Sequence, residues 1–152
     1  MRAAHSGPAK GGSRCPTTTP PGLVAAASAP LFSGAALLDA EKLDAYRVAL
    51  EFQAMACQLV PKRGYSELRD QLERASISIV LDTAEGCGRT SPADKARFYA
   101  MARGSATESA AVLDVLWARG LVDARLRARA RSLLVRIVQM LTRLQVRMAT
   151  GA

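Results

Sequence analysis

Arginine is the residue type in this sequence whose number and spacing most clearly indicate a chemical role. Five arginines near the C-terminal end recur at spacings of four and seven residues: Arg125, Arg129, Arg136, Arg143 and Arg147. On a helix that rises about 1.5 Å per residue they form one line roughly 33 Å long, comparable to several nucleotides of backbone. We call these five residues the arginine line.

The sequence leaves two interpretations of the arginine line open. Arginine binds phosphates well, so the line is a candidate nucleic-acid-binding surface. Arginine is also enriched in protein interfaces, so a solvated face or salt bridges between subunits would explain the same pattern. No acidic residue follows Asp123, and Arg127 and Arg131 lie off the line. The line must therefore face water, the carboxylates of another helix or a polyanion.

Glycines around position 86 form a second candidate site. The segment 84–89 reads Ala-Glu-Gly-Cys-Gly-Arg, and glycines that precede a helix start can hold a phosphate. No strand precedes the segment and no Gly-Lys-Ser/Thr completes a P-loop, so a structural turn is the preferred interpretation. Arg89, which ends the segment, joins the arginine line as a predicted nucleic-acid contact.

A third group of residues, Gly104, Ser105 and Glu108, lies inside a predicted helix. Gly104 costs that helix about 1 kcal/mol relative to alanine, which close helix packing would explain. Glu108 is expected to lie near the core and to pair with an arginine on a neighbouring helix or to cap a buried polar cluster. Glu85 and Glu108 are the candidates for a catalytic acid pair, but no nucleophile, metal ligand set or pocket accompanies them. We therefore predict no catalytic residue.

The cysteines and the histidine also indicate a protein that is not an enzyme. Cys15, Cys57 and Cys87 are far apart and lack the paired spacing of a zinc site or a disulfide framework. We expect reduced thiols in a cytoplasmic protein, with Cys57 and Cys87 buried. His5 is the single histidine, which leaves no second one to serve in a metal site or a catalytic triad. The sequence predicts neither a metal site nor a cofactor.

The composition indicates one basic domain. The 152 residues are 49% hydrophobic, which suffices for one core but not for two domains. The formal net charge of +8 favours polyanionic partners. Because 5% of the residues are aromatic, stacking of bases on aromatic rings is limited. No apolar run reaches the roughly eighteen residues of a membrane span, so we expect a soluble protein with no membrane partner.

Four helices are predicted to position these residues. Residues 1–38 are rich in Gly, Pro, Ser, Thr and Ala, which predicts a disordered N-terminal tail. The predicted helices run over 40–60, over 65–84 with Gly86 and Gly88 closing it, from Pro92 to a stop at Gly120, and from near Leu121 to Ala149. The clearest boundary is Ser91 as N-cap with Pro92 at the first helical position. Short connections imply an all-α fold, an antiparallel up-and-down four-helix bundle over residues 39–149.

Apolar stripes predict which face of each helix forms the core. The stripe of the last helix is Leu126, Ala130, Leu133, Ile137, Leu141, Leu144 and Met148. The stripe of the first is Leu43, Tyr46, Leu50, Ala54 and Cys57, widened by Val48, Phe52 and Leu59. The stripe of the third is Phe98, Met101, Ala102, Ser105, Ser109, Val112 and Leu116.

Several short motifs in this order resemble one known family. They are Leu43-Asp44-Ala45-Tyr46, Ala49-Leu50-Glu51-Phe52, Gln71-Leu72, Arg74-Ala75-Ser76-Ile77-Ser78-Ile79, Ala84-Glu85-Gly86, Gly88-Arg89, Phe98, Gly104-Ser105 and Glu108. Over roughly residues 43 to 144 the chain resembles the four-helix bundle proteins encoded in intervening sequences of bacterial large-subunit ribosomal RNA genes. That family is related to the accessory variability proteins of diversity-generating retroelements. Asp82 departs from the pattern, because the family usually has Asn there.

The resemblance implies an up-and-down bundle that assembles into a ring-like homo-oligomer, as a pentamer. It gives structural or assembly roles to the motif residues Glu85, Gly86, Gly88, Gly104, Ser105 and Glu108. For the retroelement relatives it implies binding to nucleic acid and to a reverse transcriptase. We therefore expect a non-enzymatic homo-oligomer that binds RNA or DNA through arginine-rich surfaces, as an accessory to a nucleic-acid enzyme. The alternative is a protein-interaction scaffold that does not bind nucleic acid.

Overall fold

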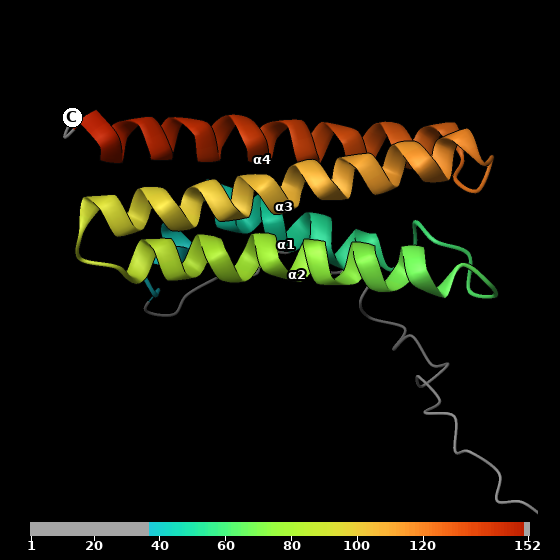
Figure 1. Ribbon diagram of the computed structural model, residues 1–152, viewed down its shortest axis with the longest axis horizontal. Helices are drawn as coiled ribbons and strands as arrows, with labels where there is room; N and C mark the ends of the chain where they lie inside the picture. The colour runs from blue at the N-terminus through green and yellow to red at the C-terminus, as the bar shows by residue number, and fades with distance from the viewer. Residues whose placement is uncertain (1–36, 151–152) are drawn as a thin grey trace, which may run out of the picture. The chain divides into compact units, whose positions relative to one another are not determined.

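The computed structural model describes residues 37–150 of the chain. Within that range it contains one short 3₁₀-helix and four α-helices, and the four α-helices are labelled in Figure 1. The elements are η2 (Ala40–Lys42), α1 (Asp44–Ala56), α2 (Ser66–Gly88), α3 (Pro92–Ala118) and α4 (Ala124–Thr150). The tail predicted over residues 1–38 lies outside the described residues, apart from its last two.

Each α-helix packs against two others. α2 contacts α1 and α3, and α4 contacts α3 and α1, which closes the bundle (Figure 1). The connections between consecutive helices are short, spanning residues 57–65, 89–91 and 119–123, so neighbouring helices run antiparallel. The predicted all-α fold, an antiparallel up-and-down four-helix bundle, is confirmed for the described residues.

Two of the predicted boundaries are confirmed by cap geometry. The Ser91 side chain accepts a hydrogen bond from the Asp94 backbone N–H at 3.4 Å, with Pro92 at the start of α3. At the other end, Gly120 has a φ of +65°. The Gly120 and Leu121 N–H groups donate to the carbonyls of Trp117 and Leu116 at 3.0 and 2.9 Å. This is a Schellman motif, which explains why α3 stops there.

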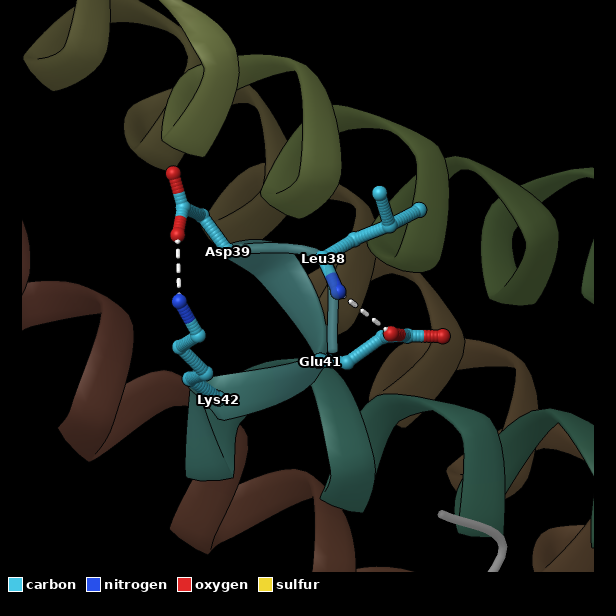
Figure 2. A network of polar contacts seen from close by, with 4 residues as sticks. All are labelled: Leu38, Asp39, Glu41 and Lys42. Atoms are coloured by element: carbon cyan, nitrogen blue, oxygen red, sulfur yellow. Dashed lines mark hydrogen bonds and ion pairs between the residues drawn. The ribbon is translucent and has the colours of Figure 1, made fainter. Parts of the chain in front are cut away.

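The first predicted helix, over residues 40–60, is wrong in its extent. The Leu38 N–H donates to Glu41 Oε2 at 2.7 Å, and Lys42 Nζ pairs with Asp39 Oδ1 at 2.8 Å, as Figure 2 shows. These contacts close a separate 3₁₀ turn, and Leu43 follows it in an extended conformation. After α1 ends, hydrogen bonds of the 3₁₀ type replace the α-helical pattern. One of them is the bond that the Gln58 N–H donates to the Met55 carbonyl at 2.9 Å.

The core confirms the centre of the predicted stripe of α4, whose ends Leu126, Leu144 and Met148 are half-buried, and corrects part of the stripe of α1. On α4 the buried residues are Ala130, Leu133, Leu134, Ile137 and Leu141. On α1 they are Ala45, Val48, Ala49, Phe52, Met55 and Ala56. Val48, Phe52 and Leu59, predicted beside the stripe, are buried. Within the stripe, Tyr46 and Leu50 are half-buried, and Cys57 is exposed rather than buried. Apolar residues surround most of α1, so its periodicity alone does not select the face that packs.

The predicted core face of α3 is also only partly correct. Ala102, Ser109, Val112 and Leu116 are buried as predicted. Met101 is 48% exposed, and Phe98 and Ser105 are half-buried. Tyr99, Ala106 and Leu113 complete the buried face in their place. As on α1, the periodicity of α3 does not select one buried face, because α3 carries apolar or small residues on nearly all sides.

Gly86 lies inside α2, which corrects the predicted helix end at residue 84. The helix continues to Gly88, and Gly86 is buried against α3. A Cβ atom added at Gly86 would lie 2.8 Å from Tyr99 Cε1 and 3.1 Å from Phe98 Cβ. The glycine is therefore required for the close approach of α2 and α3, and the segment is neither a turn nor a loop.

This close approach predicts the effect of Gly86→Ala. Tyr99 is 3% exposed and cannot move out of the way, so the added methyl group should lower the free energy of unfolding by about 1–3 kcal/mol. Gly88→Ala is the matched control, because no atom lies within 4 Å of a Cβ there. Urea unfolding followed by circular dichroism measures both variants. Equal stability of the two variants would contradict the proposed packing.

Candidate nucleic-acid interface

The arginine line lies on the surface of α4, beside its buried stripe. All five residues of the line are exposed, and their spacing keeps them within one narrow strip of the helix. The strip is on the side of α4 that faces α1, because Arg129 Nη2 lies 3.3 Å from Glu51 Oε1 on that helix. The structure thus brings the five predicted residues together on one face.

Carboxylates of the bundle neutralise only part of the line. The Arg129–Glu51 pair has side chains 60% and 45% exposed, so the pair contributes less than about 1 kcal/mol. Arg125, Arg136 and Arg143 form no ion pair with any residue in the range 37–150. The arginine line therefore presents a largely uncompensated positive strip to its surroundings.

Arg127 and Arg131 hold α4 to α3 instead of joining the line. Arg127 Nη2 lies 3.1 Å from Asp114 Oδ1, and Arg131 Nη1 lies 3.8 Å from the same oxygen. The Arg127 guanidinium also lies over the Trp117 ring, 4.8 Å from its centroid. A cation over a ring and a carboxylate partner stabilise one position of a side chain. These two arginines are thus structural.

Arg89 lies apart from the arginine line. It is the C-cap residue of α2, and α2 and α4 lie at opposite corners of the bundle (Figure 1). Arg89 pairs with Glu85, and its guanidinium lies 4.9 Å from the centroid of the Phe98 ring. Arg97, which the sequence reasoning missed, lies over the same ring at 5.1 Å. Arg97 and Phe98 are adjacent in sequence, so no periodic spacing of arginines indicates this contact.

The segment 84–89 does not form a phosphate cradle. It occupies the last turns of α2 and its C-cap, where carbonyl groups rather than N–H groups lack helical partners. The negative end of the helix dipole disfavours an anion there. The cradle interpretation is wrong because both glycines lie within the last turn of α2 rather than at the N-terminus of α3.

Glu85 and Glu108 do not form the acid pair considered from the sequence. Glu108 Oε1 accepts a hydrogen bond from Gln71 Nε2 on α2, whereas Glu85 lies fourteen residues further along the same helix. At about 1.5 Å per residue the two carboxylates are roughly 20 Å apart along the bundle. Glu108 therefore joins α2 to α3 and is exposed rather than close to the core.

Gly104 and Ser105 differ in their surroundings. The Ser105 carbonyl accepts a hydrogen bond from Ser109 Oγ at 3.0 Å. Gly104 is exposed, and no atom lies within 4 Å of a Cβ placed on it. Helix packing within the described chain, expected from the sequence, does not explain this glycine.

Asp82 lies beside Glu85 near the end of α2. Burial raises the pKa of Asp82, and the Glu85 carboxylate raises this pKa further. Both causes act against the charged form, so the ionised side chain is unfavourable in the fold.

Comparison with known proteins decides the family. The family described as 23S rRNA-intervening sequence protein matches residues 41–143. The chain belongs to this family. The match runs from η2 through most of α4, so it includes the segment 84–89, Gly104 and Glu108. A search of curated proteins finds no match.

The described helices also bear on membrane and metal binding. Among residues 37–150, no helix has both the length and the hydrophobicity of a membrane span. In the same range, no three His, Cys, Asp or Glu side chains group as metal ligands.

The raised pKa of Asp82 predicts that Asp82→Asn stabilises the fold. An acid whose pKa is higher in the folded than in the unfolded state lowers stability as the pH rises through that folded pKa. The gain from Asn should be about 0.5 kcal/mol at pH 7 and should vanish below about pH 3, where the aspartate is protonated in both states. Urea unfolding across pH measures it. Asp70→Asn, at an exposed position of α2, is the control, and the same gain there would refute the cause given.

The contacts of Arg127 predict a change in tryptophan fluorescence. Trp117 is the single tryptophan, so Arg127→Gln should alter its emission and lower the free energy of unfolding by about 1 kcal/mol. Arg136→Gln on the same helix should change neither quantity. Unaltered emission in folded Arg127→Gln protein would mean that the contact is absent in solution.

Proposed function

We propose that this protein is a non-enzymatic homo-oligomer that binds nucleic acid through the arginine line of α4. The observation that carries the proposal is the charge of that helix, which has seven arginines and no acidic residue. Three of the arginines are exposed and without an ion pair in the described range. A strip of guanidinium groups favours contact with phosphates along a backbone.

The binding we propose does not read sequence. Phosphate contacts fix the position of a protein on a nucleic acid, whereas contacts with base edges carry specificity. The arginine line offers charge along a straight helix, and it contains no aromatic residue on which a base could stack. We infer an affinity that depends steeply on salt and little on base sequence, for RNA or DNA.

Assembly would multiply the effect of the line. A ring-like homo-oligomer, as the pentamer that the family resemblance implies, would present one arginine line from each copy, and linked sites bind with higher avidity than a single one. Such an assembly suits an accessory to a nucleic-acid enzyme such as a reverse transcriptase. A cytoplasmic location fits this role.

A protein-interaction scaffold is the second candidate, and one observation favours it. Three arginines of α4 already pair with carboxylates of other helices, Arg129 with Glu51 and both Arg127 and Arg131 with Asp114. Arg125, Arg136 and Arg143 could pair in the same way with acidic groups of another subunit or a partner protein. This alternative predicts assembly without nucleic-acid binding.

A salt series of nucleic-acid binding tests the proposal. In the variant Arg125→Gln, Arg136→Gln, Arg143→Gln we expect the slope of log affinity against log salt to fall by roughly 2–3 units per bound protomer. This follows if each of the three arginines contacts one phosphate. The measurement uses nuclease-treated protein with labelled RNA and DNA, and light scattering in parallel reports whether the variant stays assembled.

A matched control separates the arginine line from general charge. Arg127→Gln with Arg131→Gln removes two positive charges from α4 outside the line, and its slope should stay close to that of the parent. An assembled parent protein that binds neither nucleic acid at low salt would exclude the proposal and favour the scaffold.

A further inference from the structure

The end of the bundle where α1 connects to α2 and α3 connects to α4 carries two exposed aromatic side chains. The connections over residues 57–65 and 119–123 both lie at this end (Figure 1). Tyr65, in the first connection, is 45% exposed, and Trp117, in the last turn of α3, is 44% exposed. The other aromatic side chains of residues 37–150 are buried or half-buried. The core of the bundle therefore does not account for the exposed surface of these two rings.

A contact between neighbouring helices places the two rings at nearly the same level of the bundle. Gln71 of α2 donates a hydrogen bond to Glu108 of α3. Trp117 follows Glu108 by nine residues, and Tyr65 precedes Gln71 by six, in the same direction because the helices are antiparallel. At about 1.5 Å per residue the two positions differ by roughly 5 Å along the bundle. The rings therefore lie side by side in level, on adjacent helices.

Tyr65 has a backbone conformation that suits glycine better than tyrosine. Its φ is +54°, and within residues 37–150 it is the one residue other than glycine with a positive φ. The Arg69 guanidinium holds this connection, because it donates to the carbonyls of Pro61 and Gly64. A bulky residue in the left-handed region costs stability, and the exposed ring recovers little of that cost by burial. The stability of this chain therefore does not explain the tyrosine.

Trp117 is held in place from one side. The Arg127 guanidinium lies 4.8 Å from the centroid of its ring, and an ion pair with Asp114 at 3.1 Å fixes that guanidinium in turn. Side chains that are already ordered lose less entropy when a ligand binds. The exposed part of the indole is thus a fixed surface on which a second planar group can stack.

Positive charge surrounds the two rings. The exposed basic residues at this end that have no ion pair in the described range are Lys62, Arg63, Arg119 and Arg125. Arg125 is also the first residue of the arginine line, so the line leads to this end. The carboxylates here are Glu67, Asp114 and Asp123. Asp114 is already paired with Arg127 and Arg131, and Asp123 Oδ1 accepts a hydrogen bond from the Leu126 N–H at 2.9 Å. The basic groups therefore favour an anionic ligand.

We propose that this end of the bundle binds the unpaired bases of a single-stranded nucleic acid. Tyr65 and Trp117 stack with the bases, while Lys62, Arg63 and Arg119 contact the flanking phosphates; we call these five residues the stacking site. Stacking on an aromatic ring accepts every base, whereas the bases of a duplex are stacked on one another. The inference rests on the proposed function and deepens it, because it names single-stranded RNA or DNA as the ligand class.

Tryptophan fluorescence tests the stacking site directly. Trp117 is the single tryptophan, so its emission reports on this site. The full-length, nuclease-treated protein is titrated with a short single-stranded RNA and, at equal phosphate concentration, with the blunt duplex that this RNA forms with its complement. We expect the single strand to quench the emission and to bind more tightly than the duplex. Equal affinity for both, with unaltered emission, would overturn the stacking site.

Replacing the rings separates stacking from charge and from folding. Trp117→Leu and Tyr65→Gly should each lower the affinity for the single strand by roughly 5- to 100-fold. The salt slope should stay at the parent value, because neither side chain is charged. Tyr65→Gly should also raise the urea midpoint, since glycine accepts a positive φ, so weaker binding by this variant cannot result from unfolding. Parent affinity in both variants would overturn the stacking site.

A matched control uses an exposed apolar side chain outside the site. Met101, also on α3 and 48% exposed, precedes Trp117 by sixteen residues, which is roughly 24 Å along the helix. Met101→Ala should keep both the parent affinity and the quenching. An equal loss of affinity in Met101→Ala would overturn the assignment to the two rings.

The phosphate contacts have their own test. The variant Lys62→Gln, Arg63→Gln, Arg119→Gln should lower the salt slope for the single strand by about 2 units, at roughly 0.7 units for each contact. An unchanged slope would overturn the part of the site assigned to these three residues.

The outcomes separate the stacking site from the proposed function. A protein that binds neither single strand nor duplex at low salt would overturn both. Binding that depends on the arginine line, without quenching and without preference for the single strand, would support the line and overturn the stacking site. Quenching that persists with the parent salt slope in the variant Arg125→Gln, Arg136→Gln, Arg143→Gln would support the stacking site and exclude the arginine line.

Discussion

Burial of the apolar stripe of α4 is the constraint on which the placement of its charges depends. The stripe is narrow and the rest of the helix is strongly polar, so only one rotation of α4 about its axis buries it. Once Ile137 and Leu141 are in the core, the arginine line must lie along the side that faces α1. Arg127 and Arg131 must then face α3. Which arginines face α1 and which face α3 is thus fixed by hydrophobic packing and not by attraction between charges.

α1 and α3 lack such a narrow stripe. For these two helices the sequence predicted that the helix exists, but not which of its faces packs against the core. α1 and α3 carry apolar or small residues on most of their surface, so the local pattern does not single out one rotation. The choice between rotations depends on contacts with other helices, such as the packing of Ala49 on α1 and Leu113 on α3, both fully buried. That information is absent from the local pattern. For this reason the predicted faces of α1 and α3 were partly wrong, whereas the centre of the predicted face of α4 was confirmed.

Helix boundaries show the same difference between local and tertiary causes. The Ser91 cap and the left-handed Gly120 are determined by a few adjacent residues, and both were predictable. Gly86 gives the same local signal as a helix end, but it lies within α2. The residue is a glycine because Tyr99 of α3 occupies the space that a side chain would need. Glycine that ends a helix and glycine that admits a neighbour cannot be distinguished without that neighbour. The structural turn predicted for residues 84–89 was wrong for this reason.

The glycines of the family motifs therefore have two different physical explanations in this chain. Gly86 is explained within the bundle, since Tyr99 and Phe98 lie against it. Gly104 is not, because open space lies above it and its conformation is ordinary for a helix. A residue that costs stability within one chain and gains nothing there is not explained by the packing of that chain. The same reasoning applies to charge: arginines of α4 that have carboxylate partners in the bundle stabilise the fold, and those without one are available to a polyanion. Function in this bundle is therefore to be sought where the packing of a single chain leaves a residue unexplained.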